Sequence, residues 1–335
     1  MSELVALGKL ENRSTQADLL VHGIRNPGSL GVSRYAARLA DALGDERVEY
    51  LLAGDARGEV RAHFHLANSS RALLVTRTRR RSPFIVTVHD VVPRLEALHA
   101  LYRARVYPQL VRHAGAVVVH SAFAADLLVR VAGRRPGRLE VIPHPARRPT
   151  DTRRDAASRA LGWPDDELIA VIPGVLKSAK LVREALAAVS HVPGWRIALA
   201  GGFHDRSDEA RAHSAGALVV ADPSDTDYER SIVGADCVFC LRSGSVGETN
   251  MPLLDALGAA RAVLATDTGS IREVARDAAV YCTGTEDAIR CALLQLSSAD
   301  VRAELECEAT KRAAELTWQA SGADHAALFR EVFHA

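Results

Sequence analysis

The amino-acid sequence predicts an α/β protein with two doubly wound halves that face one another across a cleft. Short apolar, β-like runs alternate with helical patterns along all 335 residues, which is typical of parallel sheets covered by helices. Six such runs fall in each half, and the stretch from Pro143 to Asp166 between them has no strand pattern. Doubly wound sheets bind ligands outside the carboxyl ends of their strands, so twin sheets predict a cleft between them.

The twelve candidate strands are short runs rich in apolar and β-branched residues. In the first half they are Asp18–His22, Val48–Leu52, Val60–Leu66, Phe84–His89, Ala116–His120 and Leu139–Ile142. In the second half they are Leu168–Ile172, Arg196–Ala200, Ala217–Val220, Cys237–Leu241, Ala262–Ala265 and Ala279–Cys282.

The linker and the tail complete the expected organisation. Pro145, Pro149 and Thr150 mark a linker, so we expect one domain over residues 1–148 and a second over residues 149–335. The tail from Val301 to His334 has a helical pattern with apolar residues. Its last part, about residues 315–335, is expected to pack back on the first domain.

Composition is typical of a globular cytoplasmic protein. The chain is 48% hydrophobic and 25% charged, and no run approaches the roughly 20 apolar residues that a membrane span requires. Glu3 stands where a signal peptide would carry positive charge. Five cysteines, an odd number, fit reduced thiols. Cys237 and Cys240 are spaced three apart within a predicted strand, so they should point to opposite faces as core residues rather than form a metal site.

Charge is divided unevenly between the halves. Residues 1–150 hold 23 Lys/Arg and 13 Asp/Glu (+10), which leaves 19 Lys/Arg and 28 Asp/Glu (−9) for residues 151–335. The arginines of residues 77–81 and of the segment Leu95–Arg112 can seat the first half peripherally on the inner face of an anionic membrane. Pro108 should interrupt this helix, which argues against an interfacial role and favours a core-facing helix with solvated arginines. No nucleic-acid partner is predicted.

Residues 247–256 carry the most informative chemistry. They follow the apolar run Cys237–Leu241 and open a helical pattern with Pro252 in its first turn, where a missing N–H costs nothing. A helix that starts at the carboxyl end of a parallel strand directs N–H groups and partial positive charge at the cleft, which suits a diphosphate. Glu248 and Asp255 flank this start. They can accept hydrogen bonds from sugar and ribose hydroxyls, or merely complement the helix dipole.

In the first half, three strand ends bear polar or glycine-containing loops. Gly31 precedes a predicted helix over Ser33–Leu43, where glycine lets the backbone approach a ligand or simply makes a turn. His89 ends one strand, and His120 with Ser121 ends the next. Each histidine can donate a hydrogen bond into the cleft or serve as a satisfied structural residue.

In the second half, a lysine-containing turn follows the first strand. Gly174 and Lys180 lie between that strand and a predicted helix over Leu181–Val189, where the lysine can neutralise a diphosphate or remain solvated. The chain contains neither a G-x-x-x-x-G-K-[S/T] nor a G-x-G-x-x-G motif, and no D-x-D pair placed to hold a divalent ion. We therefore predict no NTPase loop, no dinucleotide cofactor and no metal.

Together these motifs resemble the retaining family 4 glycosyltransferases, which have the GT-B fold, and the resemblance covers nearly the whole chain. The motifs that carry it are Gly31-Val32-Ser33-Arg34-Tyr35, Thr87-Val88-His89-Asp90, Val118-Val119-His120-Ser121, Val141-Ile142-Pro143-His144-Pro145, Gly174 with Lys180, Pro252-Leu253-Leu254-Asp255-Ala256 and Thr266–Val274.

The resemblance implies a transferase that moves a sugar from a nucleoside diphosphate sugar to an acceptor hydroxyl, with retention of configuration and without metal or cofactor. The first domain would be the acceptor side and the second the donor-binding side. The acceptor is unknown: a glycan, a lipid-linked molecule or a small molecule. The residues implied to act are Lys180, Gly174, Gly31, Ser121, Thr249, Asn250 and Met251 at the donor diphosphate and its surroundings, Asp255 at the ribose, Glu248 at the donor sugar, and His89 near the reacting carbon.

Three departures from the family pattern leave alternatives open. Gly247 stands where the first of the family's two acids is expected, with Glu248 displaced by one residue. Val175 replaces a frequent arginine, and Asp255 is shorter than the usual glutamate. The alternatives are a sugar-nucleotide epimerase of the same architecture and a nucleotide-sugar-binding protein that has lost catalysis.

Overall fold

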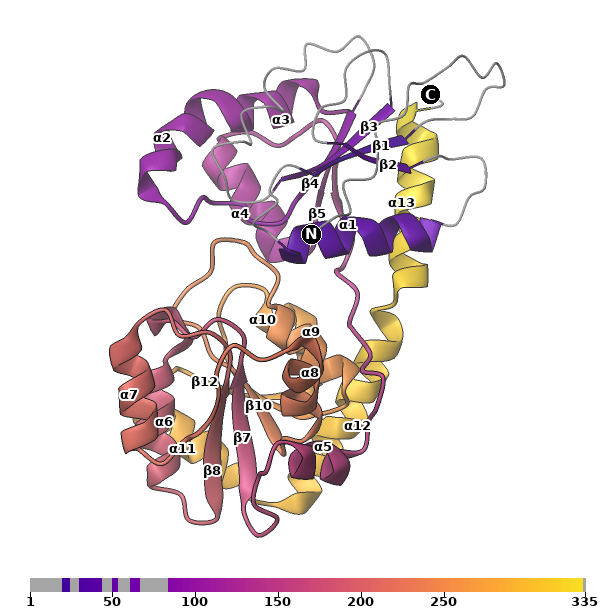
Figure 1. Ribbon diagram of the computed structural model, residues 1–335. Helices are drawn as coiled ribbons and strands as arrows, with labels where there is room; N and C mark the ends of the chain where they lie inside the picture. The colour runs from indigo at the N-terminus through magenta and orange to yellow at the C-terminus, as the bar shows by residue number, and fades with distance from the viewer. Residues whose placement is uncertain (1–19, 25–29, 44–49, 54–60, 67–83, 334–335) are drawn as a thin grey trace, which may run out of the picture.

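A computed structural model describes residues 20–24, 30–43, 50–53, 61–66 and 84–333, which form two six-stranded sheets with their helices and loops (Figure 1). Every pairing between the described strands is parallel. The first sheet has the order β2 (Tyr50–Ala53), β1 (Leu20–Ile24), β3 (Arg61–Leu66), β4 (Phe84–Val88), β5 (Ala116–Val119), β6 (Leu139–Val141). The second has the order β12 (Ala279–Cys282), β11 (Ala262–Thr266), β10 (Cys237–Cys240), β7 (Leu168–Pro173), β8 (Trp195–Ala200), β9 (Leu218–Val220).

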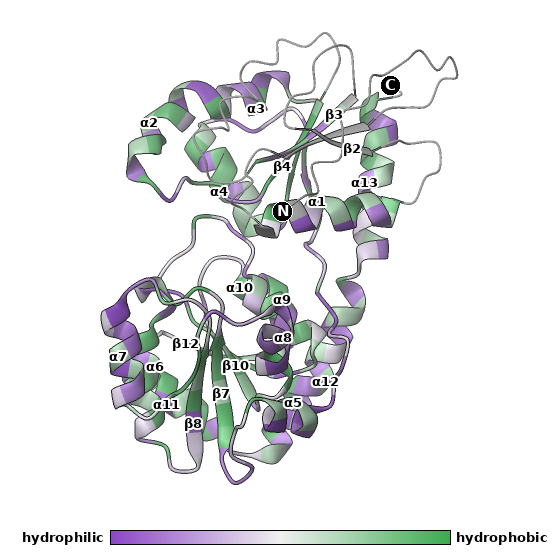
Figure 2. Ribbon diagram, viewed as in Figure 1, coloured by the Kyte–Doolittle hydropathy of each residue, from purple (hydrophilic) through white to green (hydrophobic). Residues whose placement is uncertain are grey.

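All twelve predicted runs coincide with a strand to within two residues; residues 18–19, 48–49 and 60 of those runs lie outside the described part of the chain. The central strands of the second sheet, β7 and β10, are strongly apolar (Figure 2), because helices cover both of their faces. Counted from β7, the second sheet has the strand order 3-2-1-4-5-6. From β7 the chain adds strands on one side of the sheet up to β9 and then, from β10, on the other side. Sheets of this kind bind ligands at such a reversal of strand order, which here lies between β7 and β10.

Helices divide the core of the second sheet into two clusters. One face is covered by α5 (Arg154–Ala160), α8 (Asp225–Val233), α9 (Met251–Gly258) and α10 (Ile271–Ala275), and the other by α6 (Val182–Ser190), α7 (Arg206–Ser214) and α11 (Glu286–Gln295). The helix α12 (Ala299–Glu315) contributes to both. Cys237 belongs to one cluster and Cys240 to the other, so the two thiols lie on opposite faces of β10 as predicted.

The first sheet packs against a long helical segment and against α4 (Ala122–Ala132). The segment comprises a 3₁₀ turn (Glu96–Leu98), α2 (His99–Leu101), a π-helical turn (Tyr102–Val106) and α3 (Tyr107–His113). The α-helical pattern of this segment is interrupted by the π turn, and Pro108 lies directly after it, in the first turn of α3. Tyr102, Val106 and Leu110 are buried in the core, so the arginines of this segment are left at the surface without those apolar neighbours.

The chain passes between the two sheets twice (Figure 1). The first passage, residues 142–153, joins β6 to α5, and the second joins α12 to α13 (Trp318–Phe333). The two passages touch, because the Ala146 N–H donates to the Leu316 carbonyl at 2.9 Å. The helix α13 lies against α1 (Leu30–Leu43), and its Leu328 and Phe329 complete a core cluster of the first sheet. The expected return of the C-terminal helix is confirmed.

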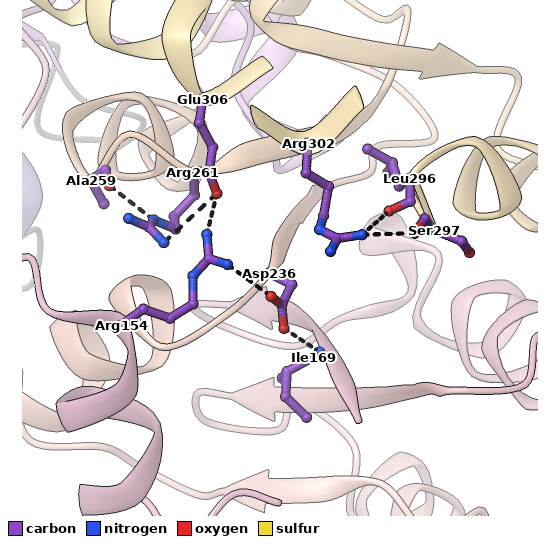
Figure 3. Close-up of polar contacts among 9 residues, drawn as sticks. All are labelled: Arg154, Ile169, Asp236, Ala259, Arg261, Leu296, Ser297, Arg302 and Glu306. Carbon is purple, nitrogen blue, oxygen red and sulfur yellow. Dashed lines mark hydrogen bonds and ion pairs between the residues drawn. The ribbon is translucent and has the colours of Figure 1, made fainter. Parts of the chain in front are cut away.

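A network of ion pairs anchors the start of the second half at the far end of its sheet (Figure 3). Arg154 pairs with Asp236 at 3.0 Å and also with Glu306. Asp236 accepts from the Ile169 N–H at 2.9 Å, at the beginning of β7. Arg261, which is nearly buried, lies 3.8 Å from Glu306. Shared partners tie α5, β7 and α12 together, so the linker enters the second half at a firmly held point.

Candidate functional site

The loop after β7 presents a buried lysine at the point where the strand order reverses. Lys180 is 5% exposed, and its ammonium group donates to the Pro173 carbonyl at the end of β7. Gly174 has φ +81°, and a Cβ there would lie 3.1 Å from the Lys180 Nζ. A side chain at Gly174 would therefore be strained and would crowd the ammonium group. The sequence prediction that these two residues share one turn is confirmed.

Two further cations, Lys177 and Arg242, lie near Lys180, and the sequence pattern did not single out Arg242. Arg242 lies two residues after the end of β10, and its backbone N–H donates to the Thr266 hydroxyl at 2.8 Å. Burial, then Arg242 and Lys177, lower the pKa of Lys180 to about 7. The charge of Glu248 acts on Arg242 and Lys177, whereas no carboxylate acts on Lys180 in the part of the chain that the structure describes. A buried ammonium group without a counter-ion favours an anionic ligand.

The start of α9 completes this cationic edge. The Asn250 side chain caps the helix by accepting from the Leu253 N–H at 3.3 Å, and Pro252 lies in the first turn. Asn250 is buried, whereas Met251 is 37% exposed. The helix start thus adds a partial positive charge at the same strand edge as Lys180 and Arg242.

Glu248 is held by its own loop and by the other domain. One carboxylate oxygen accepts from the Ser245 hydroxyl at 2.9 Å and from the Val246 N–H at 2.8 Å. The other oxygen lies 3.6 Å from a guanidinium nitrogen of Arg94. Burial opposes ionisation, but the backbone hydrogen bonds and Arg94 outweigh it and lower the pKa of Glu248. The carboxylate is therefore charged and oriented before any ligand binds.

Asp255 lies deeper, on α9. Its two oxygens accept from Arg147 Nε and from the Tyr228 hydroxyl, each at 3.0 Å. Its side chain is 7% exposed. Burial raises the pKa of Asp255 although Arg147 and Tyr228 act in the opposite direction. Arg147 belongs to the linker, so this acid also ties the second domain to the first passage of the chain.

Gly247 explains why the acid of this loop is displaced by one residue. Its φ is +86°, and a Cβ there would lie 2.6 Å from a Val91 methyl group of the first domain. The N–H groups of Val91 and Val92 both donate to the Val246 carbonyl, at 3.0 and 2.9 Å. An acidic side chain at position 247 would collide with Val91, so the structure admits only glycine there and places the carboxylate on Glu248.

On the first domain, His89 lies within a cluster of aromatic rings. Its Nε2 is 3.1 Å from His65 Nδ1, and its Nδ1 is 3.3 Å from His120 Nε2. Tyr35 of α1 packs on His89 and His120 with ring centroids 4.9 and 5.1 Å away, and it also contacts His65, His144 and Trp318. Both ring nitrogens of His89 thus face other histidines of its own domain.

Asp90, the next residue, lies on the cleft side of the same strand end. Its carboxylate is 3.2 Å from the Arg94 guanidinium nitrogen that also approaches Glu248. Burial raises the pKa of Asp90, and the charge of Glu248 raises it further against Arg94 and Lys177. Two carboxylates from opposite domains therefore meet at one arginine. The sequence motif Thr87-Val88-His89-Asp90 includes Asp90 but assigns it no role. The sequence could not reveal that Asp90 and Glu248, 158 positions apart, approach the same arginine.

The other two predicted residues have simpler surroundings. Ser121 is buried and caps α4 by accepting from the Ala124 N–H at 3.1 Å. Gly31 is exposed in the first turn of α1, and a Cβ there would meet no atom within 4 Å. Their donor-binding roles stay predictions. The described residues contain no group of three or more His, Cys, Asp or Glu able to hold a metal ion, and no helix among them is long and apolar enough to cross a bilayer.

Comparisons with known proteins agree with this architecture. The family model described as Glycosyltransferase Family 4 matches residues 60–146. No curated protein matches the chain.

Among solved structures, a glycosyltransferase from Rickettsia africae is similar over 95% of this chain and 99% of its own, with 12% identity and a TM-score of 0.71. Sucrose-phosphate synthase from Thermosynechococcus elongatus is similar over 95% and 99%, with 14% identity and a TM-score of 0.74. Anabaena Alr3699/HepE, in complex with UDP and glucose, is similar over 94% and 99%, with 14% identity and a TM-score of 0.73. At these identities the likeness concerns the fold.

Proposed function

We propose that this chain is a glycosyltransferase of family 4, which transfers a sugar from a nucleoside diphosphate sugar to an acceptor hydroxyl. The match of the family model to residues 60–146 and the GT-B fold of the two sheets support the proposal. The observation that carries the proposal is the cationic edge of the second sheet. There Arg242 and the start of α9 add positive charge around Lys180, which has no carboxylate partner among the described residues. An anionic leaving group bound there is stabilised as it departs.

The residues divide the donor between them. Lys180, Arg242 and the backbone at Thr249–Met251 hold the diphosphate, beside Gly174 and opposite Gly31. Glu248 accepts hydrogen bonds from the donor sugar, next to the strand end of His89 and Asp90. Asp255, whose oxygens keep free lone pairs beyond Arg147 and Tyr228, accepts from the ribose. Residues 1–148 and α13 form the acceptor side, and residues 149–316 form the donor side.

Retention without a metal belongs to the same proposal. The described site offers fixed cations where a diphosphate needs neutralisation, and this is the task that a divalent ion performs in metal-dependent transferases. The acceptor attacks from the side of the departing phosphate, which accepts its proton. Anabaena Alr3699/HepE has been solved with UDP-glucose, so UDP-glucose is the first donor to test.

A thermal-shift screen with UDP-, GDP-, ADP- and dTDP-sugars tests donor binding. A donor at about 100 times its Kd adds about 2.7 kcal/mol of stability. Lys180→Ala removes a charge-assisted contact worth about 1.5–3 kcal/mol, so it should weaken donor binding at least about tenfold while the protein stays folded. The matched control is Arg211→Ala, which removes an exposed arginine of α7. Unchanged donor affinity in folded Lys180→Ala would remove the diphosphate assignment.

Product analysis with the selected donor separates the alternatives. Release of the nucleoside diphosphate indicates transfer or hydrolysis, and an epimerised donor indicates an epimerase. Binding without either product indicates a protein that has lost catalysis.

A further inference from the structure

A chain of three histidines runs through the first domain, from β6 towards β3. His120 Nδ1 lies 2.9 Å from the Ile142 carbonyl, and His120 Nε2 lies 3.3 Å from His89 Nδ1. His89 Nε2 then lies 3.1 Å from His65 Nδ1. The three residues lie at or near the carboxyl ends of β5, β4 and β3, which are neighbours in the sheet.

One end of the chain determines the position of every proton in it. A carbonyl only accepts, so His120 Nδ1 carries the hydrogen, and Nε2 of a neutral His120 must accept. His89 Nδ1 must then donate to His120, and Nε2 of a neutral His89 must accept from His65 Nδ1. The opposite direction would require a doubly protonated, cationic His120. His120 is 6% exposed, and burial disfavours that cation.

The surroundings keep the rings uncharged. Tyr35 of α1 packs on all three rings, with centroids 4.9 to 5.6 Å away. Among the described residues, the charges that act on His89 come from His65, His120, His144 and His325, and none of these is a carboxylate. Burial, and then the neighbouring histidines, lower the pKa of His89 well below its usual value, and burial lowers that of His120 to about 4.

Both ring nitrogens of His89 are hydrogen-bonded to other histidines, so neither is left for a ligand. With both nitrogens bonded inside the domain, His89 can donate to a sugar hydroxyl only if the bond to His65 or His120 breaks. The residue beside it has the opposite environment, since Asp90 reaches the Arg94 group that Glu248 also approaches. The two carboxylate oxygens, each within 3.6 Å of the same nitrogen, are close enough for one sugar to contact both.

We propose that His65 and His120 are positioning residues that hold His89 as the neutral Nδ1–H tautomer, and that Asp90 is the polar side chain which this strand end offers to the donor sugar. The assignment of Asp90 to the sugar rests on the proposed function. The tautomer assignment does not, because it follows from the hydrogen bonds alone.

Long-range ¹H–¹⁵N spectra of the full-length protein at pH 7.5 test the tautomer, with His65→Gln and His120→Gln as aids to assignment. His89 and His120 should each show the single neutral Nδ1–H pattern. His120→Leu removes the acceptor and should let His89 populate both tautomers, whereas His120→Gln, whose amide oxygen can accept, should preserve one. A His89 that is an Nε2–H tautomer, or that is unchanged in folded His120→Leu, overturns the positioning role. If His120→Leu does not fold, the wild-type and His120→Gln spectra still decide.

Calorimetric binding of UDP and UDP-glucose, or of the nucleotide and nucleotide sugar that the screen selects, tests Asp90. Asp90→Asn should lower the affinity for the nucleotide sugar about tenfold relative to free nucleotide, whose affinity should stay at the wild-type value. Asp126→Asn, an exposed aspartate of α4 in the same domain, should change neither. Equal affinities in Asp90→Asn and wild type overturn the assignment to the sugar. If the wild type binds no nucleotide, the proposed function fails and the Asp90 assignment falls with it, while the spectra still decide the tautomer.

Discussion

At the scale of the residue, Lys180 is a buried lysine whose ammonium group loses its proton near neutral pH. Its ammonium group is buried beside Gly174 and has no carboxylate partner among the described residues. Burial, followed by Arg242, lowers its pKa to about 7. A bound diphosphate supplies the missing counter-charge and should move the pKa back towards its ordinary value of about 10.4.

Nucleotide binding should therefore take up protons. The free protein has Lys180 about half protonated at pH 7 and mostly neutral at pH 8.5, so uptake should rise from about half a proton to about one over that range. Calorimetry of UDP binding in buffers of different ionisation enthalpy measures this uptake. Lys180→Arg keeps the charge but cannot titrate in this range, and should bind without uptake. Equal proton uptake in Lys180→Arg and wild type would assign the titration to another group.

At the scale of the element, the loop of residues 245–250 makes one of the contacts between the two domains, beside others such as that of Glu273 with the start of α4. Residues 245–250 accept two N–H bonds from Val91 and Val92 at the Val246 carbonyl, and Gly247 leaves room for the Val91 side chain. The loop that would meet the donor sugar is thus shaped by a residue of the opposite domain.

Gly247→Ala should strain the backbone by about 1–2 kcal/mol and should also collide with Val91. A Cβ at position 247 would lie 2.6 Å from a Val91 methyl group and 2.7 Å from the Val91 Cβ, so only Val91→Gly removes both atoms. In Gly247→Ala/Val91→Gly the collision is relieved, and the two changes should be non-additive by about 1 kcal/mol or more in urea unfolding. Gly194→Ala is the matched control, because Gly194 has φ +80° with no atom within 4 Å of a built Cβ. It should show strain but no coupling to Val91→Gly. Additive effects at Gly247 and Val91 would contradict the prediction, because they would show that the loop at Gly247 and the loop at Val91 move apart without loss of stability.

Elements were predictable from the sequence where one segment contains its own signal. Buried parallel strands such as Phe84–Val88 are apolar runs, and α9 combines the cap Asn250 with Pro252. The site was predictable only in part. Arg242 and Asp90 become site residues through neighbours on other elements, and the collision at Gly247 needs a residue from the other domain. Pattern reasoning predicted an interruption at Pro108 but not the π turn that precedes it.

At the scale of the whole molecule, the buried histidines should make the free energy of unfolding fall already in mildly acidic solution. Burial lowers the pKa of His120 to about 4 and that of His144 to about 3, and burial with the neighbouring histidines also lowers the pKa of His89 well below its usual value. Between these values and the unfolded value of about 6.5, the unfolded chain binds more protons than the folded one. Stability therefore falls as the pH falls below about 6.5, by up to about 1.4 kcal/mol per pH unit for each histidine.

The three histidines together give a limiting slope of about 4 kcal/mol per pH unit. Asp90 and Asp255 have raised pKa values, so they oppose this trend only near the pH at which carboxylates titrate. The midpoint of urea unfolding, measured from pH 7.5 to 5, should fall steeply. His144→Gln should lower the slope of the unfolding free energy against pH by about 1.4 kcal/mol per pH unit, which corresponds to one proton. A midpoint that is flat over this range would show that the rings are protonated in the folded state.

The return of α13 has a consequence for synthesis on the ribosome. The N-terminal half emerges first, yet one of its core clusters lacks Leu328 and Phe329 until residues 318–333 have been translated. The second half contains both of its own clusters within residues 146–316 and can close its sheet as soon as it leaves the exit tunnel. The half that is made first is therefore finished last, and a nascent chain interrupted before α13 exposes the apolar surface of Ile85 and Val118 to the cell.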